Sequence, residues 1–594
     1  MNEMRLLRET RLLLCFAAAL GSLDAQIAVS LNTSMPSPAR MGTLIPFIAT
    51  ASNNGADKVW YRFEVGAGGE TPHIVKDFGP DNTFNWTAAD HDGNYVIRVT
   101  ARDLTTNVTA DSELIYVMEP NVSGKQQPLV TPTANSLVYL YNAPSCADGW
   151  NIRVNFSAAD GIVTTTPAKK CNPKYASTGL YLGGLRGSTT YSAASVLTNE
   201  FGRAVQGPPV IFTTAAAPGN LAVSTVVTPA PAGEPDGVML QATLFTASLA
   251  TDLNGNVIWY YPGNVSFITR PVQGGYFFGV LEDDTADSSG QIMREFDLAG
   301  TTVLETNAAR VSEQLVAQGK HAIGSFHHEA RLLPNGNIAL LAGEERILTN
   351  VQGSGAVDVL GDVIVVLDQN LNVVWSWDAF DFLDNTRLAT LNDLCEPGNC
   401  PPTYMNIGTT PPNDWLHGNS LQETEDGSLL YSARDQDWVI KINYANGSGD
   451  GKVIWRLGKG GDFTISSSDP DPWFSHQHDP EFIPGTSNMT VFDDGNVRQN
   501  ANPNATSRGQ VLQVNETNHT ATLPLNADMG LYTFALGAAQ MLPNGNYHFD
   551  VGFLSDGTST NKEVDSTGKT VYELHVAAPE YRSFRMRDMY NGPY

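Results

Sequence analysis

The sequence predicts an all-β protein: a six-bladed β-propeller preceded by two β-sandwich domains, one Ig-like and one fibronectin type III-like. Short alternating strands separated by turn residues fill the chain, and helical periodicity is scarce. The phrase Leu-Pro-Asn-Gly-Asn occurs at 333–337 and again at 542–546, with degenerate copies between. A second phrase, Val-Ile-Trp or Val-Val-Trp, follows turns at 257–259, 373–375 and 453–455. Two interleaved strand-and-turn repeats are typical of propeller blades, and roughly 40 to 60 residues per blade gives six.

The N-terminus has the pattern of a secretory signal peptide over residues 1–25. Arg5, Arg8 and Arg11 precede an apolar run at 12–20, and small and polar residues lead to Ala25. No later stretch approaches the roughly 18 apolar residues of a membrane helix. We therefore expect an exported protein, periplasmic or secreted, without membrane insertion.

Four further segments follow the signal peptide. Residues 26–120 and 121–215 each show the strand-turn spacing of a β-sandwich, Ig-like in the first and fibronectin type III-like in the second. Residues 216–237 are rich in Ala, Pro, Thr and Gly and are expected to be a linker. Residues 238–594 carry the repeats and are expected to form the catalytic propeller.

Charge and cysteines limit the partners. The formal net charge is −27, which repels phosphate backbones and anionic lipid and argues against nucleic acid as a partner. Cys15 lies in the signal peptide. The remaining four fall as Cys146 with Cys171 and Cys395 with Cys400, and an even count in an exported chain favours two disulfides over free thiols or a zinc site.

Three histidines stand at equivalent places in the repeats. His328 and His478, each followed by an acid, lead a strand that ends at a blade turn, and His417 leads into the turn at 425–427. Such positions face the central channel of a propeller, so we expect the three imidazoles to converge. The alternative is that each only hydrogen-bonds neighbouring backbone. His327 and His476 are expected to support the set, although His476 stays a candidate.

Arg434 lies on the strand after the hairpin that begins at His417, so hairpin geometry brings it back beside that histidine. A guanidinium offers paired donors to an oxyanion and keeps its charge. The alternative is a surface ion pair with Asp435 or Asp437.

These residues carry a family resemblance. The segments 414–420 (Asp-Trp-Leu-His-Gly-Asn-Ser), 432–436 (Ser-Ala-Arg-Asp-Gln), 477–479 (Gln-His-Asp) and 491–495 (Val-Phe-Asp-Asp-Gly) make the region from 238 onward similar to the bacterial arylsulfate sulfotransferase family. Ser507-Arg508 also falls where members of that family carry a Ser-Arg pair.

The resemblance implies an exported six-bladed propeller that moves a sulfuryl group from an aryl sulfate donor to a phenolic acceptor through a sulfohistidine. By position, His478 matches the nucleophile. His417, Asn419 and Arg434 match sulfate-holding residues, His328 matches a further histidine of the site, and Arg508 is expected to bind substrate. A neutral imidazole is a competent nucleophile, and Arg434 would stabilise charge on the transferring oxygens, so no cofactor is expected. The Gly-rich loops of nucleotide-sulfate enzymes are missing from the sequence.

The chain departs from the family twice. Members carry a disulfide between the arginine and the catalytic histidine, whereas Cys395 and Cys400 precede His417, and the two sandwiches replace a small N-terminal β domain. Tyr431, Trp438 and Trp473 are candidates for contacting the acceptor and equally for blade core.

Two other functions stay open. His328, His417, His478 and Asp479 could ligate a divalent cation in a metal-dependent lyase, a reading that Arg434 disfavours. The chain could also be a non-catalytic extracellular binding or adhesion protein. The oligomeric state is open, with a homodimer among the options.

Overall fold

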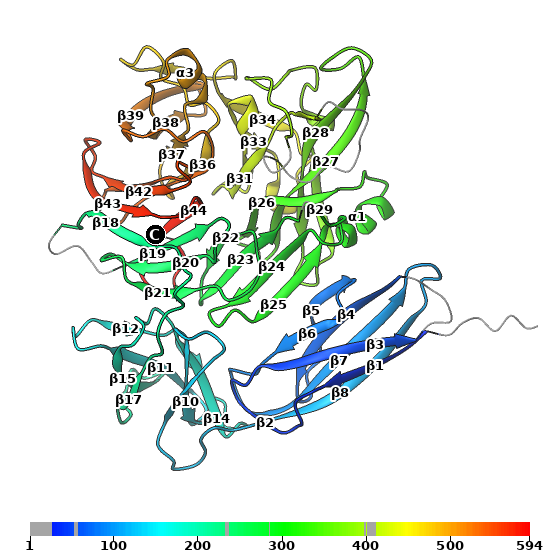
Figure 1. The fold of residues 1–594 in the computed structure, drawn as a ribbon, viewed down its shortest axis with the longest axis vertical. Helices are drawn as coiled ribbons and strands as arrows, with labels where there is room; N and C mark the ends of the chain where they lie inside the picture. The colour runs from blue at the N-terminus through cyan, green and yellow to red at the C-terminus, as the bar shows by residue number, and fades with distance from the viewer. Residues whose placement is uncertain are drawn as a thin grey trace, which may run out of the picture.

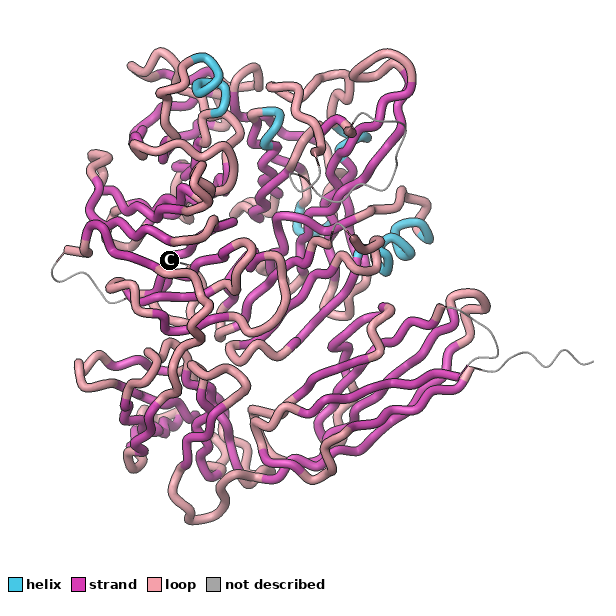
Figure 2. Tube along the Cα trace, viewed as in Figure 1, coloured by secondary structure: helices cyan, strands magenta, loops and turns pink. Residues whose placement is uncertain are grey.

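The computed structural model describes residues 27–52, 58–231, 237–283, 285–396, 400 and 411–593, so the predicted signal peptide lies outside the described residues. Strands dominate throughout (Figure 2), which confirms the all-β prediction. The described helices are short: α1 (Ala308–Ala317), α2 (Ala379–Phe382), α3 (Asn496–Ala501) and the 3₁₀ turns Arg434–Gln436 and Ala445–Gly447. In these ranges no helix has the length and apolarity to cross a membrane.

The first N-terminal unit has two groups of strands around one core. One sheet holds β1 (Ala28–Thr33), β3 (Ile45–Ser52) and β6 (Thr83–Trp86). The other holds β2 (Ala39–Arg40), β4 (Val59–Ala67), β5 (His73–Gly79), β7 (Gly93–Asp103) and β8 (Thr109–Glu119). Buried side chains of both sheets, such as Phe47 and Phe63, form a single cluster.

This first unit is joined to the rest of the chain through a shared sheet. β5 pairs in parallel with β25 (Thr302–Asn307) at Lys76 and Glu305, so one sheet runs on into the C-terminal region (Figure 1). Next to this pairing, Arg102 binds Glu313 of α1 at 2.8 Å. Because a strand pairing and ion pairs span the junction, the first unit has a defined place against α1 and β25.

The second N-terminal unit also has two sheets. The first holds β9 (Leu129–Pro132), β10 (Tyr139–Pro144) and β14 (Ser177–Leu182), and the second holds β11 (Trp150–Ser157), β12 (Val163–Thr165), β13 (Lys169–Lys170), β15 (Thr190–Asn199), β16 (Ala204–Gln206) and β17 (Val210–Thr213). The predicted disulfide between Cys146 and Cys171 is present, with Cα atoms 5.2 Å apart. Tyr590, near the C-terminus, accepts the Gly183 N–H at 2.9 Å and so ties this unit to the last strands.

The C-terminal region contains, within the described residues, six four-stranded antiparallel units, some extended by a short extra strand. The first unit holds β19 (Val238–Thr243), β20 (Leu249–Asp252) and β21 (Val257–Tyr260) with β44 (Glu580–Met586). The second holds β22 (Phe267–Val272), β23 (Tyr276–Leu281), β24 (Ile292–Asp297) and β25, and the third holds β26 (Ser325–Leu332), β27 (Ile338–Thr349), β28 (Ala356–Leu367) and β29 (Val373–Asp378) with β30 (Asn413–Asp414).

The fourth unit holds β31 (Gly418–Glu423), β32 (Leu429–Ala433), β33 (Trp438–Ile442) and β34 (Val453–Gly458). The fifth holds β36 (His478–Phe482), β37 (Asn488–Asp493), β38 (Arg508–Asn515) and β39 (Thr520–Asp528) with β35 (Thr464–Ser466). The sixth holds β40 (Gly537–Met541), β41 (Tyr547–Val551), β42 (Ser559–Val564) and β43 (Thr570–Val576) with β18 (Ser224–Thr228). β18 lies inside the segment expected to be a linker and pairs with β43.

One strand of each unit takes part in a closed ring. β22 contacts β26, β26 contacts β31, β31 contacts β36, β36 contacts β40, β40 contacts β44, and β44 contacts β22 again. We call these six the inner strands. Their units surround them in Figure 1.

Both recurring phrases have a structural reason. In each Leu-Pro-Asn-Gly-Asn copy the leucine N–H donates to the last asparagine carbonyl at 2.8 Å, and the glycine, Gly336 or Gly545, has a φ above +80° that other residues rarely adopt. The tryptophans of the other phrase, Trp259, Trp375 and Trp455, are buried between sheets. The first phrase therefore forms the turn after two of the inner strands, β26 and β40, and the tryptophans of the second phrase contribute to the hydrophobic clusters of the units.

A buried charge network occupies the middle of the ring. Arg582 of β44 donates to Glu329 of β26 at 2.8 Å, and Arg270 of β22 donates to Glu329 at 3.0 Å and to Asp479 of β36 at 2.5 Å. All four side chains are buried. Charges removed from water are tolerated only when paired, so the network fixes how four inner strands meet.

Replacing Arg582 should therefore be costly. We expect Arg582→Met to lower the free energy of unfolding by about 3–5 kcal/mol, because it leaves buried carboxylates short of a cation. Arg456→Met is the matched control, since Arg456 pairs with Asp462 while about 40% exposed, and should cost less than about 1 kcal/mol. Urea unfolding followed by tryptophan fluorescence measures both, and equal midpoints for the two variants would contradict a structural role for the network.

Candidate active site

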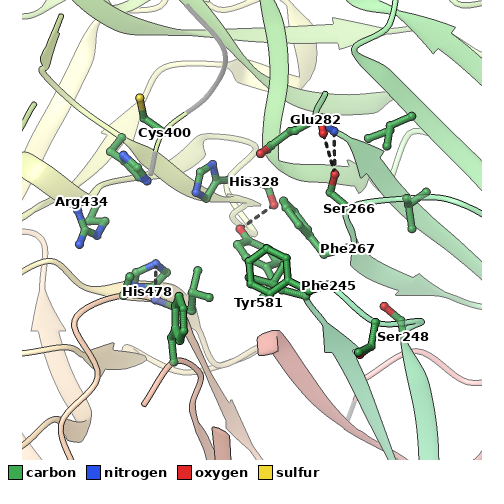
Figure 3. Close-up of a pocket in the computed structure, with 18 of the residues that line it drawn as sticks. Phe245, Ser248, Ser266, Phe267, Glu282, His328, Cys400, Arg434, His478 and Tyr581 are labelled. Atoms are coloured by element: carbon green, nitrogen blue, oxygen red, sulfur yellow. Dashed lines mark hydrogen bonds between the residues drawn. The ribbon is translucent and has the colours of Figure 1, made fainter. Parts of the chain in front are cut away.

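All six inner strands contribute a residue to one cavity. Five of these residues lie at the first position of the strand or next to it, and His328 is the fourth residue of β26: the six are Phe267, His328, His417, His478, Leu536 and Tyr581. The cavity has a volume of about 870 Å³. In Figure 3 Arg434, His328 and His478 lie around one part of it, and Ser248, Ser266 and Glu282 lie around another. The predicted convergence of the three histidines and Arg434 on one space is therefore observed.

β-Bulges direct several of these side chains. The pairing register shifts between His327 and Ala330, between Gly418 and Ser420, and between His478 and Glu481. His328 and His417 have φ of 55° and 48°, in the left-handed region that side chains rarely adopt. A bulge redirects a side chain at the end of a ladder, and strained backbone of this kind is concentrated at functional sites.

His478 has a partner at each ring nitrogen. Its Nδ1 lies 3.1 Å from Oδ2 of Asp494, and its Nε2 accepts the Leu536 N–H at 3.3 Å. Because a backbone N–H can only donate, Nε2 carries the lone pair and Nδ1 the proton. Burial, and after it Arg434 and His417, hold the pKa of His478 well below its usual value. The imidazole is therefore neutral, with its nucleophilic nitrogen at the cavity.

His417 has the opposite electrostatic environment. Its Nδ1 lies 2.5 Å from Oδ2 of Asp414. Burial acts to lower the pKa of His417, but the charge and hydrogen bond of Asp414 outweigh burial and raise it. His417 is thus favoured as an imidazolium, and its other ring nitrogen remains as a donor to an anion in the cavity.

Arg434 is buried rather than on the surface. It donates to Asp435 at 2.6 Å and to the Phe534 carbonyl at 2.9 Å, while its Nε has no hydrogen-bond partner among the described residues. The predicted alternative of an exposed ion pair is wrong in its location, since Arg434 is 7% exposed, although the pairing with Asp435 exists. Arg434 therefore lines the cavity as a fixed cation.

His476 lies behind this layer. Its ring nitrogens are 3.1 Å from Asp437 and 3.4 Å from Asp393. Burial and Arg434 act to lower the pKa of His476, but the two carboxylates raise it to about 9. It is absent from the residues that line the cavity, in agreement with the supporting role expected for it.

Two predicted binding residues lie elsewhere. Asn419 is fully buried, and its side-chain amide donates to the Gln477 carbonyl at 2.8 Å, which links β31 to the loop before β36. Arg508 donates to Asp493 and Asp469, each at 2.8 Å. Neither is among the described residues that line the cavity. The Asn419 Nδ2 and the Arg508 guanidinium take part in structural hydrogen bonds, while Oδ1 of Asn419 has no partner among the described residues, and the structure does not bring either side chain to the other four.

The candidate acceptor aromatics are also elsewhere. Tyr431, Trp438 and Trp473 pack in the hydrophobic clusters of the four-stranded units and do not line the cavity within the described ranges. The aromatic lining comes instead from Phe245, Tyr261, Phe267, Phe534, Phe553 and Tyr581. Phe267 and Tyr581 stack with ring centroids 4.0 Å apart.

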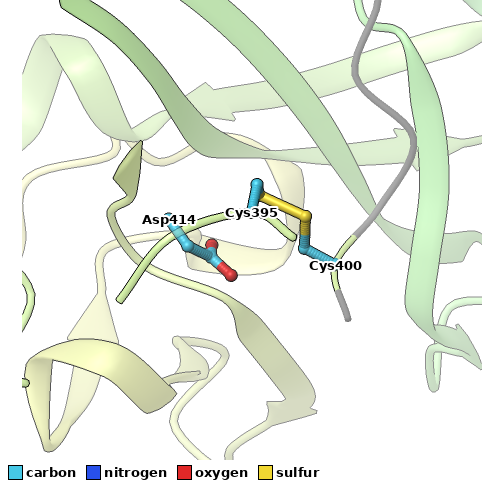
Figure 4. Close-up of side chains that lie close together, drawn as sticks. All are labelled: Cys395, Cys400 and Asp414. Atoms are coloured by element: carbon cyan, nitrogen blue, oxygen red, sulfur yellow. A yellow bond between two sulfur atoms is a disulfide. The ribbon is translucent and has the colours of Figure 1, made fainter. Parts of the chain in front are cut away.

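The second predicted disulfide, Cys395 with Cys400, borders the cavity beside Asp414 (Figure 4). The Cys395 N–H donates to the Pro412 carbonyl at 2.8 Å, and the Asp414 N–H to the Asp393 carbonyl at 3.1 Å. These bonds hold the acid that orients His417.

Potential metal-binding sets were also considered. Among the described residues they are Cys395–Cys400–Asp414, whose sulfurs form the disulfide, Asp393–Asp435–His476 and Asp414–His417–Asp435. None of these includes His328 or His478, so the ligand set expected for a lyase is not assembled as a whole.

Several site residues escaped the sequence analysis. Asp414 and Asp494 stood inside the quoted motifs, and an acid three residues before His417 was the available signal for the first. Asp494 is paired with His478 only by the fold. Leu536 acts through its backbone N–H, which leaves no trace in residue type.

Comparisons with known proteins add the family. A family model described as Arylsulfotransferase (ASST) matches residues 223–585. A comparison with curated proteins gave no match.

Solved structures give only weak similarity. A purple acid phosphatase from yellow lupin (Lupinus luteus) seeds is 13% identical over 34% of this chain and 44% of its own, with a TM-score of 0.16, so the chain spans less than half of it. A two-domain fibronectin type III segment of chicken tenascin is 14% identical over 31% of this chain and 96% of its own, with a TM-score of 0.14. The FN1–FN3 domains of chicken CNTN1 are 10% identical over 48% of this chain and 97% of their own, with a TM-score of 0.15. TM-scores this low carry no argument about fold.

The family model is different in extent, because it covers more than half of the chain and includes the four residues that converge on the cavity. The chain belongs to the arylsulfotransferase (ASST) family.

Proposed function

We propose that the protein transfers a sulfuryl group from an aryl sulfate donor to a phenolic acceptor, with His478 as the covalent carrier. Membership of the family supports arylsulfotransferase activity in general. The observation that carries the specific proposal is the state of His478: a neutral, buried imidazole whose Nε2 lone pair lies at the cavity wall near Arg434 and His417. A nucleophile beside two fixed cations suits attack on an anionic sulfate ester.

The reaction has two displacements. In the first, Nε2 of His478 attacks sulfur, the bond from sulfur to the aryl oxygen breaks, and the aryl oxygen leaves with the electron pair. In the second, the acceptor oxygen attacks the same sulfur, the sulfur–nitrogen bond breaks, and its electron pair returns to Nε2. The proton of Nδ1, held towards Asp494, keeps Nε2 available in both steps.

The charge on the transferring oxygens is met by the protein itself. Arg434 offers a guanidinium and His417 an imidazolium, and both are fixed by carboxylates, Asp435 and Asp414. Donors that are already oriented need no reorganisation as charge develops. We assign His328 to the same site because it lines the cavity with its ring centroid 4.9 Å from that of His417.

We also infer that the six units form a six-bladed β-propeller, which the closed ring of inner-strand contacts supports. In this reading residues 238–594 are the catalytic domain, residues 26–120 and 121–215 are two sandwiches, Ig-like and fibronectin type III-like, and β18 joins the last blade from the linker. The two disulfides fit an exported protein.

His478→Asn should abolish the transfer. We expect purified protein to release nitrophenolate from 4-nitrophenyl sulfate faster when a phenol is added, and the variant to lose at least about 10³-fold in kcat, since the carrier atom is gone. Mass spectrometry of donor-treated protein should find an acid-labile sulfuryl adduct on the peptide that contains His478. The matched control is His548→Asn, a buried histidine outside the cavity. An adduct on another residue, or full activity of the His478 variant, would overturn the assignment.

Asp414→Asn should move the basic limb of the pH–activity profile to lower pH. Asp414 raises the pKa of His417, so the imidazolium persists above the usual histidine range and activity falls as pH rises through that pKa. Without the carboxylate the pKa drops and the loss begins earlier, with activity reduced on the order of tenfold at pH 8. Asp462→Asn, at a surface ion pair, is the control that should keep the wild-type profile. An unshifted limb in Asp414→Asn would exclude His417 as the group responsible.

A further inference from the structure

Two consecutive histidines at the start of β26 face each other. Nδ1 of His327 lies 3.0 Å from Nδ1 of His328, and the ring planes cross at 79°. Neighbouring residues on a strand normally point to opposite faces. Here the left-handed φ of His328, at the bulge that follows His327, turns its ring back towards its neighbour. The fully buried His327 thereby contacts the histidine that lines the cavity.

A carboxylate lies at the far end of this pair. Oδ1 of Asp362 on β28 is 3.4 Å from Nε2 of His327, which is within ion-pair distance, although this nitrogen has no hydrogen-bond partner of full geometry among the described residues. The other oxygen, Oδ2, accepts the Tyr431 hydroxyl at 2.5 Å and the Gly418 N–H at 2.6 Å. Burial acts to raise the pKa of Asp362, but His327 and these two donors outweigh it and lower the pKa. Asp362 is therefore ionised although it is 2% exposed.

The ionised acid fixes where the protons lie. The negative charge of Asp362 stabilises a proton on Nε2 of His327, which favours the tautomer in which Nδ1 of His327 is the acceptor. Nδ1 of His328 must then be the donor in the 3.0 Å contact. The remaining nitrogen of His328, Nε2, is left with a lone pair. The chain Asp362–His327–His328 thus presents a basic nitrogen on the residue that lines the cavity.

We propose that Asp362, His327 and His328 form a proton relay that serves as general base for the acceptor phenol and as general acid for the leaving aryl oxygen. This inference rests on the proposed sulfuryl transfer. His328 is the residue that meets the aryl oxygen, and His327 and Asp362 are positioning residues that act through it.

Each half-reaction balances with one proton. In the acceptor step the phenol proton moves to Nε2 of His328, and the proton on its Nδ1 moves to Nδ1 of His327. The phenol oxygen bonds to sulfur as the bond from sulfur to His478 breaks. In the donor step the movements reverse: Nε2–H of His328 protonates the leaving oxygen, and Nδ1 of His328 recovers its proton from His327. The proton given by the acceptor is the one that the next leaving group takes.

The surroundings decide where the positive charge rests. Burial, then His417, His327, His478 and Arg582, hold the pKa of His328 well below its usual value, so an imidazolium there is disfavoured. Tyr581 and Phe267 pack against the same ring and offer no charge. His327 instead has the ionised Asp362 beside it. When the proton passes along the relay, the positive charge comes to rest on His327, beside the carboxylate of Asp362 and away from Arg582.

Acceptor acidity separates this proposal from a structural role. General catalysis helps a weakly acidic phenol and has little to offer a phenol that is already ionised. With 4-nitrophenyl sulfate as donor, we expect Asp362→Asn and His327→Gln to lose on the order of 10²-fold in kcat towards unsubstituted phenol, and less than about threefold towards a strongly acidic polyfluorinated phenol at pH 8. His548→Gln, which replaces a buried histidine hydrogen-bonded to Ser583, should lower both rates equally or not at all.

Two readouts separate a failed relay from a failed sulfuryl transfer: the burst of nitrophenolate and the sulfated His478 peptide. Both should persist in the two relay variants, because nitrophenolate is a good leaving group that needs no acid catalyst. Absence of the burst from the wild-type protein would refute the proposed function itself. With the burst present, a loss that is equal for all acceptors, or no loss, would overturn the relay. His327→Gln could lower the melting temperature too far for an assay. In that case Asp362→Asn, which keeps the size of the side chain, tests the relay by the ratio of its kcat losses towards the two phenols.

Discussion

The pairing of β44 with β19 is the contact on which the site depends. It joins residues 238–243 to residues 580–586, from opposite ends of the C-terminal region, in antiparallel register from Val238 with Met586 to Thr243 with Glu580. Without it the inner strands would form an open row, and β44 would have no fixed distance to β22 or β40. Because the ring is closed, every inner strand has two neighbours, and the residues at the cavity end of each strand meet around one space. Tyr581 and Arg582 reach the centre only through this pairing.

Closure alone would not supply chemistry, because regular strands alternate their side chains between faces. The bulges after His327, Gly418 and His478 break that alternation at the cavity end of three successive inner strands. Left-handed backbone at His328 and His417 is costly for non-glycine residues, at about 1–3 kcal/mol each, and is retained only where the surrounding structure fixes it. Glu329 of the buried network follows His328 directly in the chain, and Arg582 of the same network donates to the Asn419 carbonyl near His417, so the network constrains both positions.

The features of this structure that the sequence predicts are those that depend on residues close together in the chain or on a repeated pattern. Turn chemistry is local, so the Leu-Pro-Asn-Gly-Asn hairpins and the strands around them were predictable, and residues in equivalent places of a repeat, such as His328 and His478, could be expected to converge. Arg508 shows the limit: a Ser-Arg pair says nothing about whether Asp493 and Asp469 will consume the guanidinium. Asn419 fails in the same way, since its partner is a backbone carbonyl. Asp362 was invisible, because only a strand pairing across the third unit puts it next to His327.

The same geometry explains why a site proposed to take sulfate esters contains so many acids. Asp414, Asp435 and Asp494 each contact a nitrogen of His417, Arg434 or His478, and of the three acids only Asp414 lines the cavity. Asp414 favours an imidazolium at His417, whereas burial raises the pKa of Asp494 well above its usual value and the ring of His478 beside it stays neutral. A cation that is paired with an acid is fixed in position and still attracts an anion in the cavity, but less strongly than a free cation does. Free cations would bind the sulfate ester so tightly in its ground state that the barrier to reaction would rise. Asp362 also lies beside a histidine, but its partner His327 reaches the cavity only through a second imidazole, that of His328. In our proposal Asp362 therefore governs the movement of a proton, whereas the acids beside His417 and Arg434 govern the binding of an anion.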